Sequence, residues 1–156
     1  MKNIFSILKF TALMVVLLAV IYPLAIYGIA QFAPNKGKGE TVSVNGKVVG
    51  YQKIGQKFDK SNYFWGRPSA VDYNAAGSAG SNKGPSNPDY LALVQKRIDT
   101  FMVAHPYLKK SEIPLELVTA SGSGLDPNIS PEGALIQVKH VAKERKLSEE
   151  KVRALV

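Results

Sequence analysis

The chain has 156 residues, with 20 Lys plus Arg against 12 Asp plus Glu and a formal net charge of +8 at pH 7. Hydrophobic residues make up 46% and charged residues 21%, a composition that excludes a disordered or fibrous chain. The sequence contains no Cys and only two His, which excludes disulfides, thiol nucleophiles, Cys-based metal sites and multi-histidine metal sites. The length allows one small domain once a membrane segment is subtracted.

The first predicted element is a transmembrane helix over residues 10–33. No charged residue lies between Lys9 and Lys36, and about 20 apolar residues suffice to cross a bilayer core of about 30 Å. Pro23 predicts a kink in this helix, or a notch for a partner helix together with Gly28.

A cleaved signal peptide is the alternative, since Gly28-Ile29-Ala30 resembles a cleavage site. The apolar run exceeds the usual h-region of about 7–15 residues, so we expect it to be retained as an anchor. Lys2, Lys9 and the free amine precede the helix, and Lys36 and Lys38 follow it, so the positive-inside rule gives only a modest margin. A nine-residue head before an entire domain also favours a cytoplasmic N-terminus, and we expect residues 1–9 to be cytoplasmic. Residues 34–156 then form an extracytoplasmic domain.

The domain is basic, but its charges are scattered. Residues 34–156 hold 18 of the 20 basic and all 12 acidic side chains, and no nucleic-acid-binding motif is present. We interpret the charge as a solvated, partly membrane-facing surface, with no nucleic acid as partner.

A β-hairpin is expected over residues 41–51. Two β-rich runs flank Asn45-Gly46, a pair that favours the positive φ angles of a type I′ turn.

Residues 62–88 predict a long loop, because Gly and Pro recur throughout from Gly66 onward. The aromatic residues Tyr63, Phe64 and Trp65 indicate that the loop is ordered. Its spacing fits neither common phosphate-binding motif.

Three helices follow in the prediction. Asn87 caps the first, which ends near His105, and we interpret this histidine as a surface residue at the helix C-terminus. Residues 113–119 alternate like a short strand. Ser130 and Ser148 cap the second and third helices. The predicted fold class is α+β, with a hairpin-containing sheet and two to three helices.

A serine-hydrolase site is an alternative suggested by the stretch Ser121–Asp126. The nucleophile motif G-x-S-x-G is not met, because Ser121 stands where the first Gly is needed before Ser123. Asp126-Pro127 is interpreted as a turn. A membrane-tethered binding module or hydrolase therefore remains only the second hypothesis.

Several motifs in order resemble the KdpC family, the small subunits of the bacterial ATP-driven potassium transporter Kdp. The resemblance runs from the anchor to near the end of the chain. The matching segments are residues 54–58, 63–70, 80–82, 86–88 and 117–131.

The resemblance implies an accessory, non-catalytic subunit with one transmembrane helix. Its partners would be a KdpA-like channel subunit and a KdpB-like P-type ATPase subunit. Family members have been assigned a role in assembly and in raising the ATP affinity of the ATPase subunit, so ATP is implied through that subunit and no cofactor is expected to bind directly. Gln137 matches a glutamine proposed to contact ATP; as a plain alternative, it is a surface residue on a helix.

The leading hypothesis places the loop on a partner. Tyr63, Phe64, Trp65 and Arg67 are expected to contribute to the interface or to the packing of the loop beneath it. Related subunits continue beyond Val156 with a strand-forming segment, so we expect a shortened chain whose hairpin has an open edge.

Overall fold

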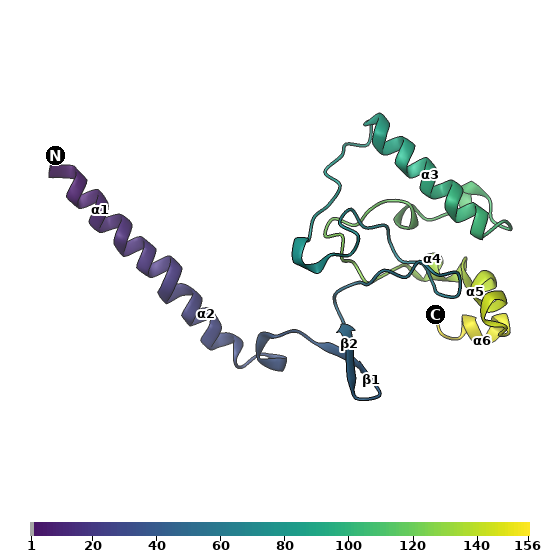
Figure 1. Ribbon diagram of the computed structural model, residues 1–156, viewed down its shortest axis with the longest axis horizontal. Coiled ribbons are helices and arrows are strands. Elements are labelled where there is room, and N and C mark those ends of the chain that lie inside the picture. The colour runs from purple at the N-terminus through teal and green to yellow at the C-terminus, as the bar shows by residue number, and fades with distance from the viewer. Residues whose placement is uncertain (1) are drawn as a thin grey trace. The chain divides into compact units, whose positions relative to one another are not determined.

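The computed structural model describes residues 2–156 and their side chains from Asn3 onward. It divides into two compact units, one extending to Tyr51 and the other covering Gln52–Val156 (Figure 1). Each unit is described by itself.

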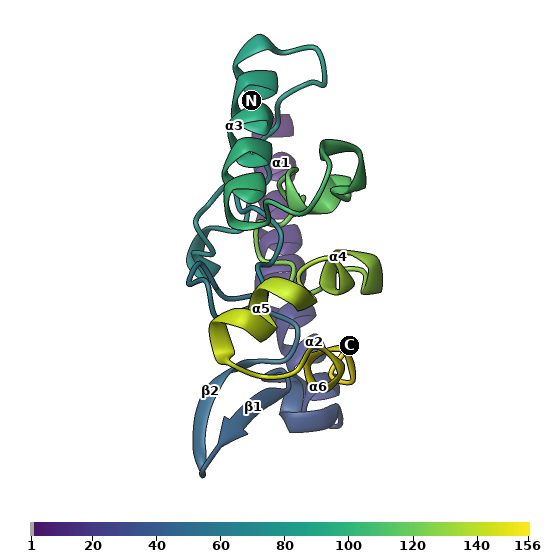
Figure 2. The same cartoon turned by 90° about the vertical axis from the view of Figure 1, so that its right-hand side faces the viewer.

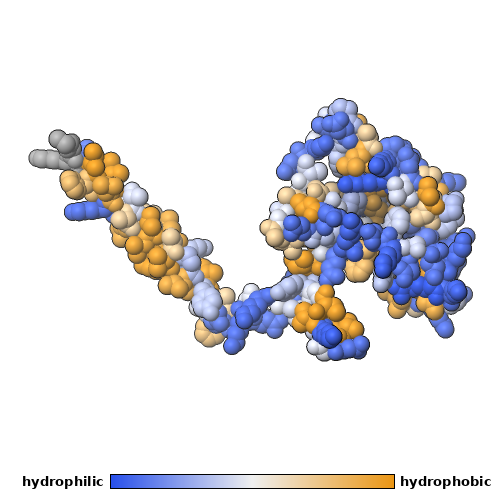
Figure 3. All heavy atoms as spheres, in the orientation of Figure 1, coloured by the Kyte–Doolittle hydropathy of each residue, from blue (hydrophilic) through white to orange (hydrophobic). Residues whose placement is uncertain are grey.

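The first unit begins with one long helix. It comprises α1 (Lys2–Val15), a π-helical segment (Val16–Ile21) and α2 (Tyr22–Ala30). Residues Asn3–Ala30 are long and apolar enough to cross a membrane, and nothing in this unit buries their side chains (Figure 3). The apolar side chains of this helix are thus left uncovered within their own unit.

The helix accommodates Pro23 with a widened turn. Proline has no backbone N–H, and its ring collides with the carbonyl group four residues earlier, here that of Ala19. Ala19 lies inside the π-helical segment, where hydrogen bonds span five residues instead of four. The predicted kink thus takes the form of a π-helical stretch, and the helix continues to Ala30.

The predicted hairpin is confirmed. Strand β1 (Thr41–Val44) pairs antiparallel with β2 (Lys47–Tyr51), and Val44 is opposite Lys47. Asn45 and Gly46 have φ angles of 51° and 76°, as a type I′ turn requires. In residues 2–156 this two-stranded sheet is the whole β structure, and nearly all of its side chains are exposed.

The second unit contains the predicted helices. Helix α3 (Pro88–Ala104) begins where the Asn87 side chain accepts a hydrogen bond from the N–H of Tyr90. The helix predicted from Ser130 is broken into α4 (Pro131–Leu135) and α5 (Val138–Arg145), and α6 (Glu149–Arg153) follows. With the hairpin, these helices confirm the α+β class.

The strand predicted over residues 113–119 is wrong. Leu115–Leu117 forms a short 3₁₀ helix, and the Thr119 hydroxyl donates to the Leu115 carbonyl at 2.7 Å. The apolar alternation misled because the neighbours Leu117 and Val118 are both buried, whereas a strand would turn them to opposite faces.

The core of the second unit lies where α5 and α6 pack together (Figure 2). Val138, Val141 and Ala142 of α5 meet Val152 of α6, and Phe64 of the long loop packs against them. The loop is thus part of the hydrophobic core.

Candidate functional site: the aromatic loop and its pocket

The segment 62–87, which precedes α3 and contains Tyr63, Phe64 and Trp65, is called the aromatic loop. Gln137 anchors it to the break between α4 and α5. Its Oε1 accepts the Trp65 N–H at 2.8 Å, while Nε2 donates to the Trp65 carbonyl at 3.2 Å and to the Gly133 carbonyl at 2.9 Å. The side chain is 0% exposed, so its interpretation as a surface residue is wrong. Both backbone groups of Trp65 depend on this amide.

The Trp65 ring contacts the end of α3. It lies edge-on to both Phe101 and His105, and its centroid is 5.9 Å from the centroid of the Phe101 ring and 5.7 Å from that of the His105 ring. The Trp65 Nε1 donates to the Lys60 carbonyl at 3.2 Å. Trp65 therefore joins the loop to α3 as well as to α5.

The interpretation of His105 as a surface residue is also wrong. Its ring is 0% exposed, stacks on Phe101 at 4.1 Å and lies 4.6 Å from the ring of His140. Burial lowers the pKa of His105 below its ordinary value, an effect that a hydrogen bond between Nδ1 and the Phe101 carbonyl partly opposes. The Nε2 atom has no hydrogen-bond partner among the described residues.

Arg67 forms an ion pair with Asp126. The distance from Nη1 to Oδ2 is 3.0 Å, and both side chains are about a quarter exposed, at 27% and 26%. The N–H of Asn128 donates to Oδ1 of Asp126, which confirms the predicted turn. This hydrogen bond and Arg67 hold the pKa of Asp126 below its ordinary value, although partial burial opposes them.

The loop is tied to residues 121–126 at further points. The Ser69 hydroxyl donates to the Gly124 carbonyl at 2.7 Å, and the Ser121 N–H donates to the Pro68 carbonyl at 3.2 Å. Within the loop, the Tyr73 hydroxyl donates to the Arg67 carbonyl at 2.6 Å. The Gly55 N–H donates to the Leu125 carbonyl at 2.7 Å. The two segments are so close here that a Cβ atom on Gly55 would be 2.7 Å from the Asp126 carbonyl oxygen. Segments that are far apart in the sequence thus meet around one loop.

The arrangement gives no support to the hydrolase hypothesis. Ser123 Oγ accepts the N–H of Leu125, and Ser121 is buried. Across residues 2–156, neither serine hydroxyl is hydrogen-bonded to His105 or His140, so the serine and base of a triad are not joined.

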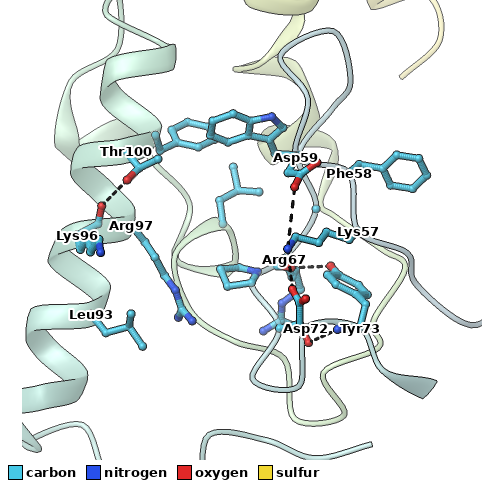
Figure 4. A pocket seen from close by; sticks show the side chains of 16 residues that line it. Lys57, Phe58, Asp59, Arg67, Asp72, Tyr73, Leu93, Lys96, Arg97 and Thr100 are labelled. Atoms are coloured by element: carbon cyan, nitrogen blue, oxygen red, sulfur yellow. Dashed lines mark hydrogen bonds and ion pairs between the residues drawn. The ribbon is translucent and has the colours of Figure 1, made fainter. Parts of the chain in front are cut away.

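A pocket of about 450 Å³ opens between the aromatic loop and α3 (Figure 4). Its apolar wall is formed by Trp65, Pro68, Leu93, Phe101 and Leu117. Its charged lining residues are Lys57, Asp59, Arg67, Asp72, Lys96 and Arg97. Arg97 was not among the predicted site residues, because nothing in the sequence pattern of α3 distinguishes it from a solvent-facing arginine.

The predicted interface residues differ in exposure. Tyr63 is exposed, with its ring 5.4 Å from that of Phe58 and 5.2 Å from the Arg145 guanidinium, whereas Phe64, Trp65 and Arg67 are partly buried and hold the loop to its own domain. Pro23 and Gly28 lie on the exposed helix of the other unit, and no atom lies within 4 Å of a Cβ built on Gly28.

Sequence comparisons agree with the predicted family. The family model described as "KdpC: K+-transporting ATPase, c chain" matches residues 4–156. A potassium-transporting ATPase KdpC subunit of Flavobacterium psychrophilum is 88% identical over all of this chain and 85% of its own length. The corresponding subunits of Flavobacterium johnsoniae and Bacteroides thetaiotaomicron are 81% and 53% identical, again over all of this chain and over 85% and 84% of their own lengths.

Proposed function

Because the chain belongs to the KdpC family and is thus an accessory subunit of a potassium-transporting ATPase, we propose that it acts without catalysis, as a membrane-anchored scaffold. Its partners would be a KdpA-like channel subunit and a KdpB-like P-type ATPase subunit. The observation that carries this proposal is the long apolar helix, whose side chains nothing in its own unit covers.

The proposed topology has residues 1–9 in the cytoplasm, residues 10–33 in the membrane and residues 34–156 outside. Lys2 and Lys9 before the helix favour this orientation under the positive-inside rule. The second unit would then lie on the side of the membrane that contains no ATP pool.

The anchor would pack against a partner helix through Pro23 and Gly28. Small residues let helix backbones approach closely in a bilayer, and the space beside Gly28 is open within its unit. In the extracytoplasmic domain, Tyr63 is the exposed member of the aromatic loop and is therefore its best candidate for direct contact. Phe64, Trp65 and Arg67 would act mainly by fixing the loop that presents it.

Gln137 would serve the same purpose. Its Oε1 and both described bonds of Nε2 are directed to Trp65 and Gly133, so nucleotide contact would first require these hydrogen bonds to break. Direct contact with ATP stays a prediction. An effect of this subunit on the ATP affinity of the ATPase subunit would be exerted through assembly.

Co-purification with the channel and ATPase subunits tests the proposal. We expect Tyr63→Ala and Gly28→Leu to lower recovery of the complex without unfolding the subunit, whereas Val103→Ala, at an exposed apolar residue of α3 outside the loop, should not. Protease added to sealed spheroplasts should remove the carboxyl-terminal domain. Full protection of that domain, or full recovery of the complex from both variants, would contradict the proposal.

A further inference from the structure

The pocket between the aromatic loop and α3 contains more positive charge than its own carboxylates neutralise. Lys57 pairs with Asp72 at 2.8 Å and approaches Asp59 at 4.0 Å, and Arg67 pairs with Asp126. Lys96 and Arg97 also line the pocket, and neither forms an ion pair with any residue of the described range 2–156. The excess positive charge therefore lies on the α3 side.

Arg97 is the more informative of these two cations. Figure 4 shows its side chain extending from α3 toward the space between the helix and the opposite wall. Its Nη1 donates to the Val118 carbonyl at 3.1 Å, which fixes the guanidinium at the wall. Partial burial lowers the pKa of Arg97, an effect that Tyr90 partly opposes, and no carboxylate of residues 2–156 pairs with this cation.

An uncompensated guanidinium beside an apolar wall has a clear chemical complement. A guanidinium has five N–H donors in a planar fork that matches the two oxygens of a carboxylate, and one of the five is already directed to Val118. The apolar wall would cover hydrocarbon or an aromatic ring. A volume of about 450 Å³ lies within the usual range for sites that enclose small ligand groups.

We propose that this pocket receives an acidic side chain, with an apolar neighbour, from a partner subunit of the ATPase complex, and that Arg97 is the counter-ion of its carboxylate. The proposal rests on the proposed function for the existence of such a partner and extends it by naming the recognised chemistry. Charge complementarity and the apolar wall together favour this occupant, because Arg97 lacks an anionic partner and a free anion would leave the apolar wall uncovered.

The pocket has a built-in reporter, because Trp65 lines it and is the one Trp in the chain. The full chain in a mild non-ionic detergent would be titrated with phenylacetate, which carries one ring and one carboxylate, and with the neutral phenylacetamide. We expect a saturable change in Trp65 emission and about tenfold tighter binding of the acid. A response that does not saturate, or equal binding of acid and amide, would overturn the proposal.

Three variants distinguish Arg97 from general electrostatics. Arg97→Gln should abolish the preference for the acid, whereas Arg153→Gln on α6, which removes the same charge away from the pocket, should leave it intact. Leu93→Glu would place a carboxylate one helical turn before Arg97 and should also abolish binding, by occupying the guanidinium from within the chain. Leu93 is partly exposed, so this variant keeps the test valid should Arg97→Gln fail to fold.

Co-purification then separates this proposal from the more general one. If the unmodified chain assembles and Arg97→Gln and Leu93→Glu lower recovery about tenfold relative to Arg153→Gln, both stand. If all variants assemble equally, the proposed function stands and the carboxylate pocket is wrong. If the unmodified chain does not assemble, the proposed function itself fails. Arg97-dependent binding to phosphatidylglycerol nanodiscs, with none to phenylacetate, would assign the pocket to lipid phosphate and overturn the proposal.

Discussion

Replacement of Gln137 by Leu should detach the aromatic loop from the helices. The substitution removes three hydrogen bonds and leaves the Trp65 N–H without its acceptor and the Trp65 carbonyl without its donor. A buried polar group without a partner costs about 1–3 kcal/mol, so the loss of partners for these two groups should lower the free energy of unfolding by about 2–6 kcal/mol. Small domains are stable by about 5–15 kcal/mol, so a large part of the stability of the second unit depends on this one amide.

Urea unfolding of the full chain in detergent, followed by Trp65 emission, measures the effect. The first unit contains no Trp, so the transition reports the second unit. With a slope of about 2 kcal/mol per M, the unfolding midpoint should fall by about 1–3 M. Gln95→Leu is the matched control, because Gln95 makes its hydrogen bonds at the exposed surface, and its effect should stay within about 0.5 kcal/mol.

The same variant separates the structural role of Gln137 from a nucleotide-binding role. If Gln137 only holds the loop, Gln137→Leu should lower the ATP affinity of the assembled complex by no larger factor than it lowers the yield of the complex. An unchanged unfolding midpoint for Gln137→Leu would refute the reasoning, and a loss of ATP affinity at unchanged stability would favour direct contact.

Three further predictions concern other parts of the second unit. Because burial lowers the pKa of His105 in the folded state, the unfolded chain binds a proton at this histidine at a higher pH than the folded chain does. The free energy of unfolding should therefore fall as pH drops below about 6.5, by up to about 1.4 kcal/mol per pH unit. In urea unfolding between pH 8 and 5, His105→Phe should remove this slope. Arg67→Met should lower the free energy of unfolding by about 1–2 kcal/mol at pH 7. Because the pKa of Asp126 is lowered in the folded state, the difference in stability between the two proteins should disappear as pH falls below about 4. A difference that stays constant with pH would exclude the ion pair as its cause. Gly124→Ala should cost about 1–3 kcal/mol in thermal unfolding, because φ is +68° and a Cβ would be 2.6 Å from Val71 Cγ2, whereas Gly122→Ala, with open space around it, should be nearly neutral.

The elements that the sequence predicted correctly are those with local physical causes. Asn45-Gly46 requires only its own positive φ angles, and Asn87 and Ser130 accept N–H groups three residues ahead. A cap or a tight turn is complete within a few residues. Such elements are therefore independent of the rest of the fold.

The errors at His105 and Gln137 concern residues whose surroundings come from distant segments. His105 is buried by Trp65 and His140, and Gln137 by a loop 72 positions earlier in the chain. A helix terminus and a helical glutamine look solvent-exposed in sequence. The pocket was missed for the same reason, since Arg97 and Trp65 belong to separate segments that only the folded domain brings to one cavity.

The length of the first helix sets how deeply it can lie in a bilayer. The candidate membrane span Asn3–Ala30 has 28 residues and extends about 42 Å, whereas the hydrocarbon layer of a bilayer is about 30 Å thick. The stretch from Phe10 to Ala30 alone covers about 32 Å. An upright helix in such a bilayer would leave its first two turns among the lipid headgroups and Lys9 at the boundary of the hydrocarbon layer. Insertion deeper by one turn would move the Lys9 ammonium group into that layer. In the proposed topology, Lys9 would therefore limit how deeply the helix can lie in the hydrocarbon layer.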